Sequence, residues 1–178
     1  MDIDPAIAAR LGFVKTRYVV VERERRWICR SVPRDLVEQT EAISDLYVDG
    51  ARLRLRDARP LDGSPPRLRL TRKVDVDART RLISSIYLPE DELAFLARVF
   101  TGARIEKLRH RLRPVAGAIS MSVDEFRGAL EGLLLLEAEF ETDAQLAAFV
   151  APEFATREVT DDARYTGGSL ARNGAPGA

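Results

Sequence analysis

The sequence is short of several features, and each shortage excludes a class of protein. Its one cysteine, Cys29, cannot close an internal disulfide, so a disulfide-stapled scaffold is excluded and a reducing compartment is favoured. Lysine plus arginine equals aspartate plus glutamate at 28 each. The chain therefore lacks the excess of positive charge that is typical of nucleic-acid-binding proteins. No apolar run is long enough to span a bilayer. The N-terminus lacks the basic start and apolar stretch of a signal peptide. We therefore expect a cytoplasmic protein with no nucleic-acid or membrane partner.

Arginine and strand-like alternation are abundant instead. The only lysines are Lys15, Lys73 and Lys107, and the planar fork of arginine suits bidentate contact with phosphate or carboxylate. Residue alternation and β-rich composition predict strands within residues 18–32, 43–57, 67–76, 79–88, 103–114, 116–126 and 132–141. Turn residues predict reversals at residues 60–66, 77–78 and 115–117.

Helical segments are fewer and shorter. They are predicted within residues 1–16, 34–41, 89–102 and 142–149. Asp4-Pro5 is a start signal for the first, and Thr142 is a cap for the last. Residues 167–178 are rich in glycine and are expected to form a flexible tail.

One domain over residues 1–178 accounts for these elements, because the length suits a single core. The fold class is α+β, mainly β, with mostly antiparallel strands. A sheet of about eight strands tends to curl or close on itself.

Several predicted strands carry charge of one sign along one face, because side chains on a strand alternate between its two sides. The basic faces hold Arg52, Arg54 and Arg56; Arg67, Arg69 and Lys73; and Lys107, Arg109, Arg111 and Arg113. The acidic faces hold Glu22 and Glu24, and Glu137, Glu139 and Glu141. Each face taken alone fits a solvated surface that keeps strand edges from pairing. Taken together, the faces fit a closed sheet that turns them inward and covers its apolar outside with helices.

Such an interior would suit metal-assisted phosphoryl chemistry. Mg²⁺ takes oxygen ligands, which alternate glutamates on a strand can supply, and it bridges to phosphate oxygens. Arginines and lysines around the same cavity would neutralise a triphosphate and its developing charge.

The ordered motifs resemble the CYTH domain, or triphosphate tunnel metalloenzyme, family. The Glu-x-Glu-x-Lys opening of that family corresponds to Glu22, Glu24 and Arg26 in VERERRW. Further blocks follow in the same order as YVDGARLRLRD, LTRK, IEKLRHRL, SVDEFRGALEGLLLLEAEFE and REVTDDARYTGGSLA. Together they cover almost the whole chain from Tyr18 onward.

The resemblance implies an eight-stranded antiparallel β-barrel that forms a tunnel, with helices packed on its outside. It implies that Mg²⁺ or Mn²⁺ is held by Glu22, Glu24, Glu137 and Glu139. It implies that a triphosphate is bound by Arg52, Arg54, Lys73, Lys107 and Arg109. Asp124 and Arg26 are the expected catalytic residues.

Departures from the family pattern are also specific. Arg26 stands where lysine is usual, and Gly167 stands where asparagine is frequent. Ile83, Ser85 and Ser122 occupy positions that are often glutamate, so fewer carboxylates are available.

We therefore expect metal-dependent hydrolysis of a triphosphate small molecule, with inorganic tripolyphosphate preferred because no aromatic cluster offers a base-stacking platform. The alternative is a non-catalytic or weakly active protein that binds phosphate, polyphosphate or a nucleotide. Adenylate cyclase and thiamine triphosphatase, both known in the family, form a third hypothesis. A homodimer is left open.

Overall fold

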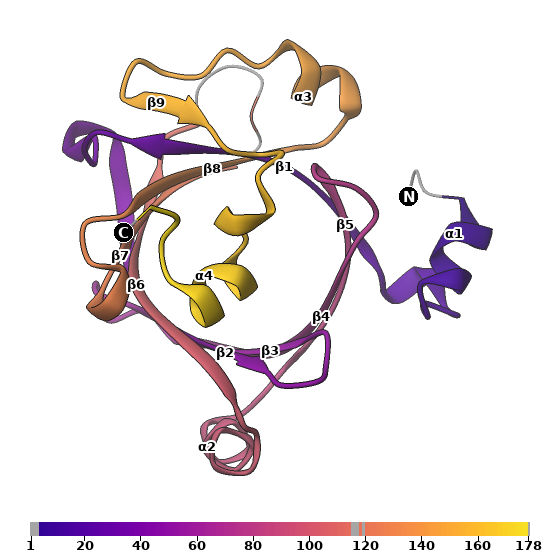
Figure 1. Ribbon diagram of the computed structural model, residues 1–178. Coiled ribbons are helices and arrows are strands. Elements are labelled where there is room, and N and C mark those ends of the chain that lie inside the picture. Colours follow the sequence, from indigo (N-terminus) through magenta and orange to yellow (C-terminus); the bar gives the residue numbers. More distant parts are fainter. Residues whose placement is uncertain (1–3, 115–117, 119, 178) are drawn as a thin grey trace.

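A computed structural model describes residues 4–114, 118 and 120–177 and shows a closed antiparallel barrel (Figure 1). Its strands are β1 (Val20–Cys29), β2 (Val37–Val48), β3 (Leu53–Pro60), β4 (Arg67–Asp75), β5 (Thr80–Tyr87), β6 (Gly102–Leu112), β7 (Ser120–Phe126) and β8 (Leu134–Phe140). A ninth strand, β9 (Ala155–Glu158), lies outside the ring. The sheet order is β5-β4-β3-β2-β6-β7-β8-β1-β9, and β5 also pairs with β1. The predicted eight-stranded barrel is confirmed.

Strand β1 closes the barrel because it pairs with both ends of the sheet. Val20 to Arg23 pair with β5, while Arg23 to Ile28 pair with β8. The end of β1 then pairs with β9, whose strand was not predicted. This double pairing places Glu22 beside Arg81 and Glu24 beside Glu139 in the register.

Four α-helices accompany the barrel among the described residues: α1 (Pro5–Arg10), α2 (Glu90–Val99), α3 (Asp143–Ala148) and α4 (Gly167–Asn173). Asp4 caps α1 through Ala6 N, and Thr142 forms a capping box on α3, as the sequence signals predicted. None of these helices is long and apolar enough to cross a membrane.

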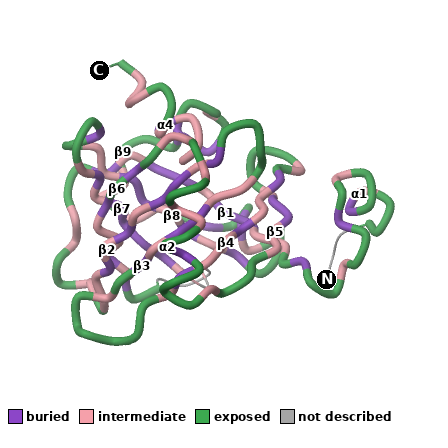
Figure 2. The backbone as a smooth tube through the Cα atoms, turned by 90° about the horizontal axis from the view of Figure 1, so that it is seen from below, coloured by how far each residue is buried: buried purple, intermediate pink, exposed green. Residues whose placement is uncertain are grey.

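The apolar outer face of the barrel packs under these helices. Leu93 of α2 packs against outward side chains of β2, β3 and β4, including Leu46. Leu146 of α3 and Phe149 pack against Trp27 on β1. Buried residues follow the barrel strands, whereas loops and most of α1 are exposed (Figure 2). The expected arrangement, with an apolar outside under helices and a polar inside, is therefore present.

Two local predictions are wrong. Only residues 34–36 of the expected helical patch form a 3₁₀ turn, because the chain then enters β2 at Val37. The alternation over residues 43–57 is not one strand but parts of β2 and β3, joined at a turn where Gly50 has φ 68°. The reversal predicted at residues 115–117 lies outside the described residues.

The end of the chain is not a flexible tail. Residues from Gly167 form α4, which lies within the outline of the ring in Figure 1. Leu170 of α4 and the preceding Tyr165 are 2% and 4% exposed, and they pack against Ile105, Phe126 and Leu135. These buried apolar contacts fix the C-terminal segment at one mouth of the barrel.

Candidate active site in the barrel lumen

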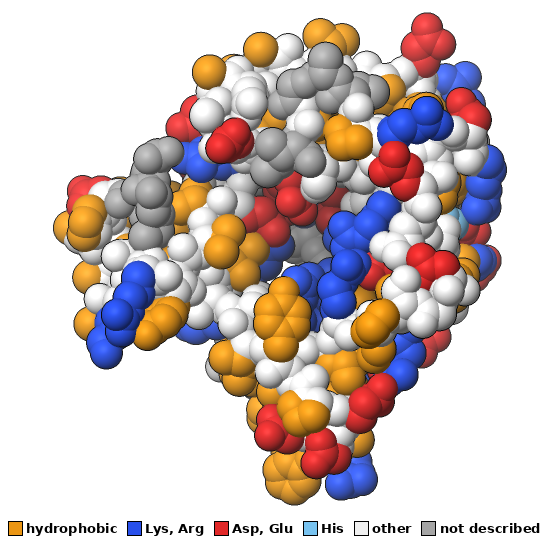
Figure 3. All heavy atoms as spheres, turned by 180° about the vertical axis from the view of Figure 1, so that it is seen from behind, with side chains coloured by type: hydrophobic (Ala, Val, Ile, Leu, Met, Phe, Trp, Pro, Cys, Tyr) orange, Lys and Arg blue, Asp and Glu red, His pale blue; other side chains and the backbone are white. Residues whose placement is uncertain are grey.

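Alternate residues of the strands point into the barrel and enclose a cavity of about 340 Å³. Seen from the side opposite to Figure 1, the molecule is hollowed, and acidic and basic side chains gather around the hollow (Figure 3). Every predicted site residue lines the cavity except Asp124, which is fully buried. The lining set is Glu22, Glu24, Arg26, Arg52, Arg54, Lys73, Lys107, Arg109, Glu137 and Glu139.

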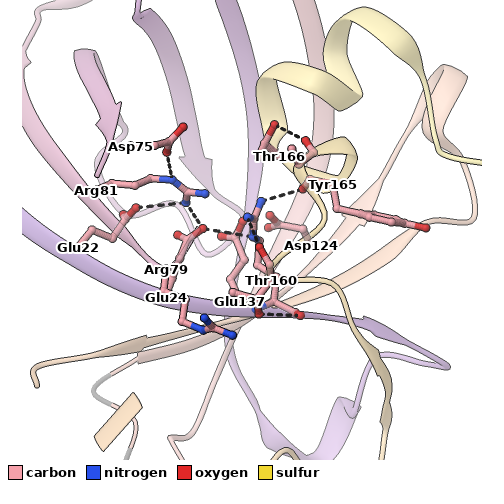
Figure 4. A network of polar contacts seen from close by, with 12 residues as sticks. Glu22, Glu24, Asp75, Arg79, Arg81, Asp124, Glu137, Thr160, Tyr165 and Thr166 are labelled. Atoms are coloured by element: carbon pink, nitrogen blue, oxygen red, sulfur yellow. Dashed lines mark hydrogen bonds and ion pairs between the residues drawn. The ribbon is translucent and has the colours of Figure 1, made fainter. Parts of the chain in front are cut away.

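The glutamates of β1 and β8 form what we call the acidic wall: Glu22, Glu24, Glu137 and Glu139. Lys73 Nζ of β4 lies 2.5 Å from Glu22 Oε2 of β1. Arg81 of β5 contacts Glu24 of β1 (Figure 4). Burial alone would raise the pKa of Glu22, but the Lys73 ammonium holds it below its ordinary value. Burial outweighs Lys73 at Glu24 and raises the pKa of that carboxyl, with Glu22 and Glu137 adding to the effect.

On β8, Glu137 contacts Arg109, while Glu139 faces Glu24 across the β1–β8 ladder. The charges of Arg109 and Lys107 overcome the effect of burial and hold the pKa of Glu137 well below its ordinary value. Glu137 is therefore ionised at neutral pH.

Asp124 lies behind two cations of the lumen. Its carboxylate contacts Lys107 and accepts two hydrogen bonds from Arg109, both of 2.7 Å. Burial and the nearby Arg109 lower the pKa of Lys107. This geometry lets Asp124 orient Lys107 and Arg109, and it leaves Asp124 itself outside the cavity surface.

Three inward arginines, Arg54 and Arg56 of β3 and Arg69 of β4, form what we call the arginine wall. Asp45 of β2 accepts hydrogen bonds of 2.6 Å from both Nε and Nη2 of Arg56. Arg54 Nε lies 3.7 Å from the same aspartate, too far for a hydrogen bond. The Nε atoms of Arg54 and Arg69 are buried and have no hydrogen-bond partner among the described residues. One carboxylate thus contacts two of the three guanidinium groups, and among the described residues Arg69 has no carboxylate partner.

Arg26 is turned toward the C-terminal segment. Its Nη1 donates to the Tyr165 carbonyl at 2.9 Å, and its Nη2 donates to the Thr160 carbonyl at 3.3 Å. The planar guanidinium of arginine reaches both carbonyls at once, whereas the single ammonium of a lysine lacks this geometry. The substitution of Gly for Asn at 167 has a reason nearby, because a Cβ there would lie 2.0 Å from Tyr47 Oη.

The donor chemistry of the acidic wall fits a hard divalent cation, since all four side chains offer carboxylate oxygens into one cavity. The described part of the chain nevertheless holds no group of three or more acidic, histidine or cysteine side chains arranged to hold a metal ion. Lys73, Arg81 and Arg109 occupy the carboxylates instead. A cation would have to compete with these ion pairs.

Sequence reasoning did not assign several cavity-lining residues to the site, namely Arg56, Arg69, Arg81, Tyr165 and the α4 residues, nor Asp45, which is buried beside Arg56. Arg56 and Arg69 belong to strand faces already recognised as basic, so their alternation with Arg54 was a usable signal. Asp45 had no comparable signal in the sequence, because its ion pair with Arg56 depends on the β2–β3 register. His110 lies outside the set of cavity-lining residues, bonded to Glu125 at 2.8 Å and to Thr40 at 3.0 Å.

Two curated proteins share sequence with part of this chain. A segment of 69 residues is 41% identical to an inorganic triphosphatase of Acetivibrio thermocellus and spans 39% of this chain and 42% of that protein. A segment of 70 residues is 37% identical to an inorganic triphosphatase of Nitrosomonas europaea and spans 39% and 46%. The matched length is less than half of either relative. No family model matches the chain.

Solved structures resemble the whole barrel. The crystal structure of an inorganic triphosphatase superposes with a TM-score of 0.58 and 24% identity over 85% of this chain and 95% of that chain. A conserved hypothetical protein from Pyrococcus furiosus gives a TM-score of 0.51 and 17% identity over 71% and 83%. These structures establish the fold. Together with the ordered motifs and the partial sequence identity, they support the resemblance of this chain to the CYTH domain, or triphosphate tunnel metalloenzyme, family.

Proposed function

We propose that the protein hydrolyses inorganic tripolyphosphate in its lumen, with Mg²⁺ or Mn²⁺ as the cofactor. The observation that carries this proposal is the enclosure of both acidic and basic side chains in one cavity. Relatives with partial sequence identity are inorganic triphosphatases, which agrees with this substrate class. The described lumen residues include no group of stacked aromatic rings that would favour a nucleotide base.

The lumen side chains divide the work of the reaction. Lys73, Lys107 and Arg109 would bind phosphate oxygens and balance their charge. Asp124 would hold Lys107 and Arg109 in place, as its contacts indicate. Glu22, Glu24, Glu137 and Glu139 would hold the divalent cation. When bound, that cation supplies charge neutralisation and lowers the pKa of water.

The chemistry is a displacement at the terminal phosphorus. A water oxygen forms a bond to that phosphorus, and the bridging P–O bond breaks. Diphosphate leaves with the electron pair, and the proton of the water passes to a lumen carboxylate and then to solvent. The products are orthophosphate and diphosphate. The cations of the lumen contribute by fixing the phosphates in line and by stabilising their charge.

One observation favours a second candidate, a phosphate or polyphosphate sensor without turnover. Glu22, Glu24 and Glu137 are each paired with a cation, and the β5 positions Ile83 and Ser85 add no carboxylate. A lumen neutralised in this way could bind an anion and hydrolyse nothing.

Phosphate release from tripolyphosphate with Mg²⁺ or Mn²⁺ separates the two candidates. We expect turnover by the wild type and a loss of about 100-fold or more in Glu24→Gln, because a carboxylate of the acidic wall is removed. Glu106→Gln is the matched control, since Glu106 is exposed on β6 and should leave turnover unchanged. Tight binding without release would favour the sensor, and equal release by wild type and Glu24→Gln would remove Glu24 from the mechanism.

A further inference from the structure

The arginine wall carries more positive charge than its neighbours neutralise. Asp45 is the carboxylate beside it, and both Asp45 oxygens are taken by Arg56. Arg69 sits opposite Arg56 in the β3–β4 register, so two guanidinium groups face the lumen side by side. Like charges in direct register repel unless an anion lies between or beside them.

Arg69 is the least neutralised member of this wall. Its Nε is buried without a hydrogen-bond partner, and among the described residues no carboxylate is paired with it. Its polar neighbour is the hydroxyl of Tyr87, its register partner on β5. Burial and the charges of Arg56 and Arg54 lower the pKa of Arg69 to about 10. The side chain therefore remains charged at neutral pH and offers an unused donor to the cavity.

The neighbouring inward arginine of β4 shows that this shortage is local. Arg67 contacts Glu41, which also accepts a hydrogen bond of 2.9 Å from Arg111. Arg67 does not line the cavity, whereas Arg69, two residues further along the same face, does. The strand thus carries one arginine that is neutralised by a carboxylate and one that is available to a ligand.

We propose that Arg69, with Arg54 beside it, forms an anion subsite that holds the leaving-group end of a linear phosphate chain. This inference rests on the proposed function and deepens it by giving the substrate a direction. The phosphoryl group that is attacked would lie at the acidic wall, where carboxylates can hold a cation. The remaining diphosphate would then extend to the arginine wall, where excess cations meet its charge. Lys107 lies on β6, which stands between the strands of the two walls in the sheet order β4-β3-β2-β6-β7-β8-β1.

The test compares Arg69→Gln with Arg67→Gln in the full chain. For Arg69→Gln we expect KM for tripolyphosphate and the inhibition constant of diphosphate to rise together by about tenfold, which is the value of one charge-assisted contact. The kcat should change by less than about twofold, because this contact is equally strong in ground and transition states. Arg67→Gln should leave all three values within about twofold of wild type. Arg69→Lys keeps the charge but loses the planar guanidinium. Its KM and its inhibition constant for diphosphate should therefore lie between those of wild type and Arg69→Gln.

Calorimetric titration with diphosphate separates this inference from the proposed function. Diphosphate binding that weakens in Arg69→Gln but not in Arg67→Gln supports the subsite, even if tripolyphosphate is not turned over. Turnover of tripolyphosphate with equal diphosphate binding in both variants would overturn the subsite and leave the proposed function standing. If Arg69→Gln does not fold, Arg69→Lys decides, since unchanged diphosphate affinity in that variant contradicts a contact made through the guanidinium fork.

Discussion

The acidic wall and the arginine wall face the same cavity but are neutralised to different degrees. On the acidic wall, Glu22 and Glu137 each contact a lysine or arginine that comes from another strand. On the arginine wall, Asp45 is the carboxylate beside three arginines: it binds Arg56 through two hydrogen bonds, lies 3.7 Å from Arg54 and is not paired with Arg69.

This difference indicates which wall would contribute most of the binding free energy of an anionic ligand. Acidic and basic residues balance over the whole chain, so the excess positive charge of the arginine wall is a local property of the fold. A phosphate that enters the lumen meets unused donors on the arginine wall and occupied carboxylates on the acidic wall. Binding free energy should therefore come mainly from the arginine wall, and chemistry from the acidic wall.

The largest expected effect comes from Asp45→Asn, which removes the one carboxylate of the arginine wall. Breaking a buried ion pair while leaving its partner charged costs about 3–5 kcal/mol, so we expect this loss in the free energy of unfolding at neutral pH. Added tripolyphosphate should restore more stability to the variant than to the wild type, because the anion replaces the missing charge. Thermal unfolding with and without the anion measures both effects.

The same variant has a defined pH dependence. Arg56 and Arg54 overcome the effect of burial and lower the pKa of Asp45 in the folded protein. A depressed carboxyl pKa contributes stability that is present above the unfolded value, about 3.9, and that is lost as pH falls through the folded pKa. The difference in melting temperature between wild type and Asp45→Asn should be largest above about pH 5 and should decrease below it. A difference that is constant down to about pH 2 would contradict this account. Asp57→Asn is the control, because Asp57 lies on the outer face of β3, its side chain is 28% exposed and it pairs with Arg59 instead of a lumen arginine.

Glu137→Gln is the next largest change, and it addresses the acidic wall. Here kcat should fall by about 100-fold, while KM changes less, because the carboxylate acts on the reacting end of the substrate. Steady-state kinetics with tripolyphosphate measures both parameters. Glu141→Gln, exposed just beyond the end of the same strand, should leave kcat unchanged. A large rise in KM with constant kcat would mean that the two walls do not divide binding from chemistry.

Local patterns predicted most of the barrel and much of its lining. Strict alternation placed Glu137 and Glu139 on one face and Leu136 and Phe140 on the other, and the structure confirms both faces. Turn residues located the β4–β5 hairpin because the Asp77 side chain accepts bonds from the backbone there. These features depend on neighbours in sequence, so a single chain reveals them.

The rest depends on contacts between distant segments. Pairing of β9 with β1 joins residues more than 120 positions apart, and no local pattern marks it. The glycines at the start of α4 have low helix propensity, so the sequence predicts a flexible tail there. The helix forms because Leu170 is buried against the barrel, a tertiary contact that local propensity does not reveal. The neutralisation of Arg56 but not Arg69 follows from the β2–β3 register, which decides where Asp45 lies. Sequence thus predicted the charges of the lumen but not which of them remain available.

The smallest expected effect is that of Arg26→Lys, and it separates two uses of an inward arginine. Arg26 donates to the carbonyls of Tyr165 and Thr160 and is 3% exposed, so it holds the C-terminal segment. Lysine keeps the charge but not the fork, and we expect a loss of about 1 kcal/mol in the free energy of unfolding. Limited proteolysis should then cut the segment after Arg164 or Arg172 faster than in wild type, while Arg23→Lys, which loosens the contact with Asp143 on α3, should not have this effect. KM for tripolyphosphate should stay within about twofold of wild type in Arg26→Lys. A tenfold rise would show that Arg26 contacts the substrate, as the family motif predicts, and that it belongs functionally with Arg69.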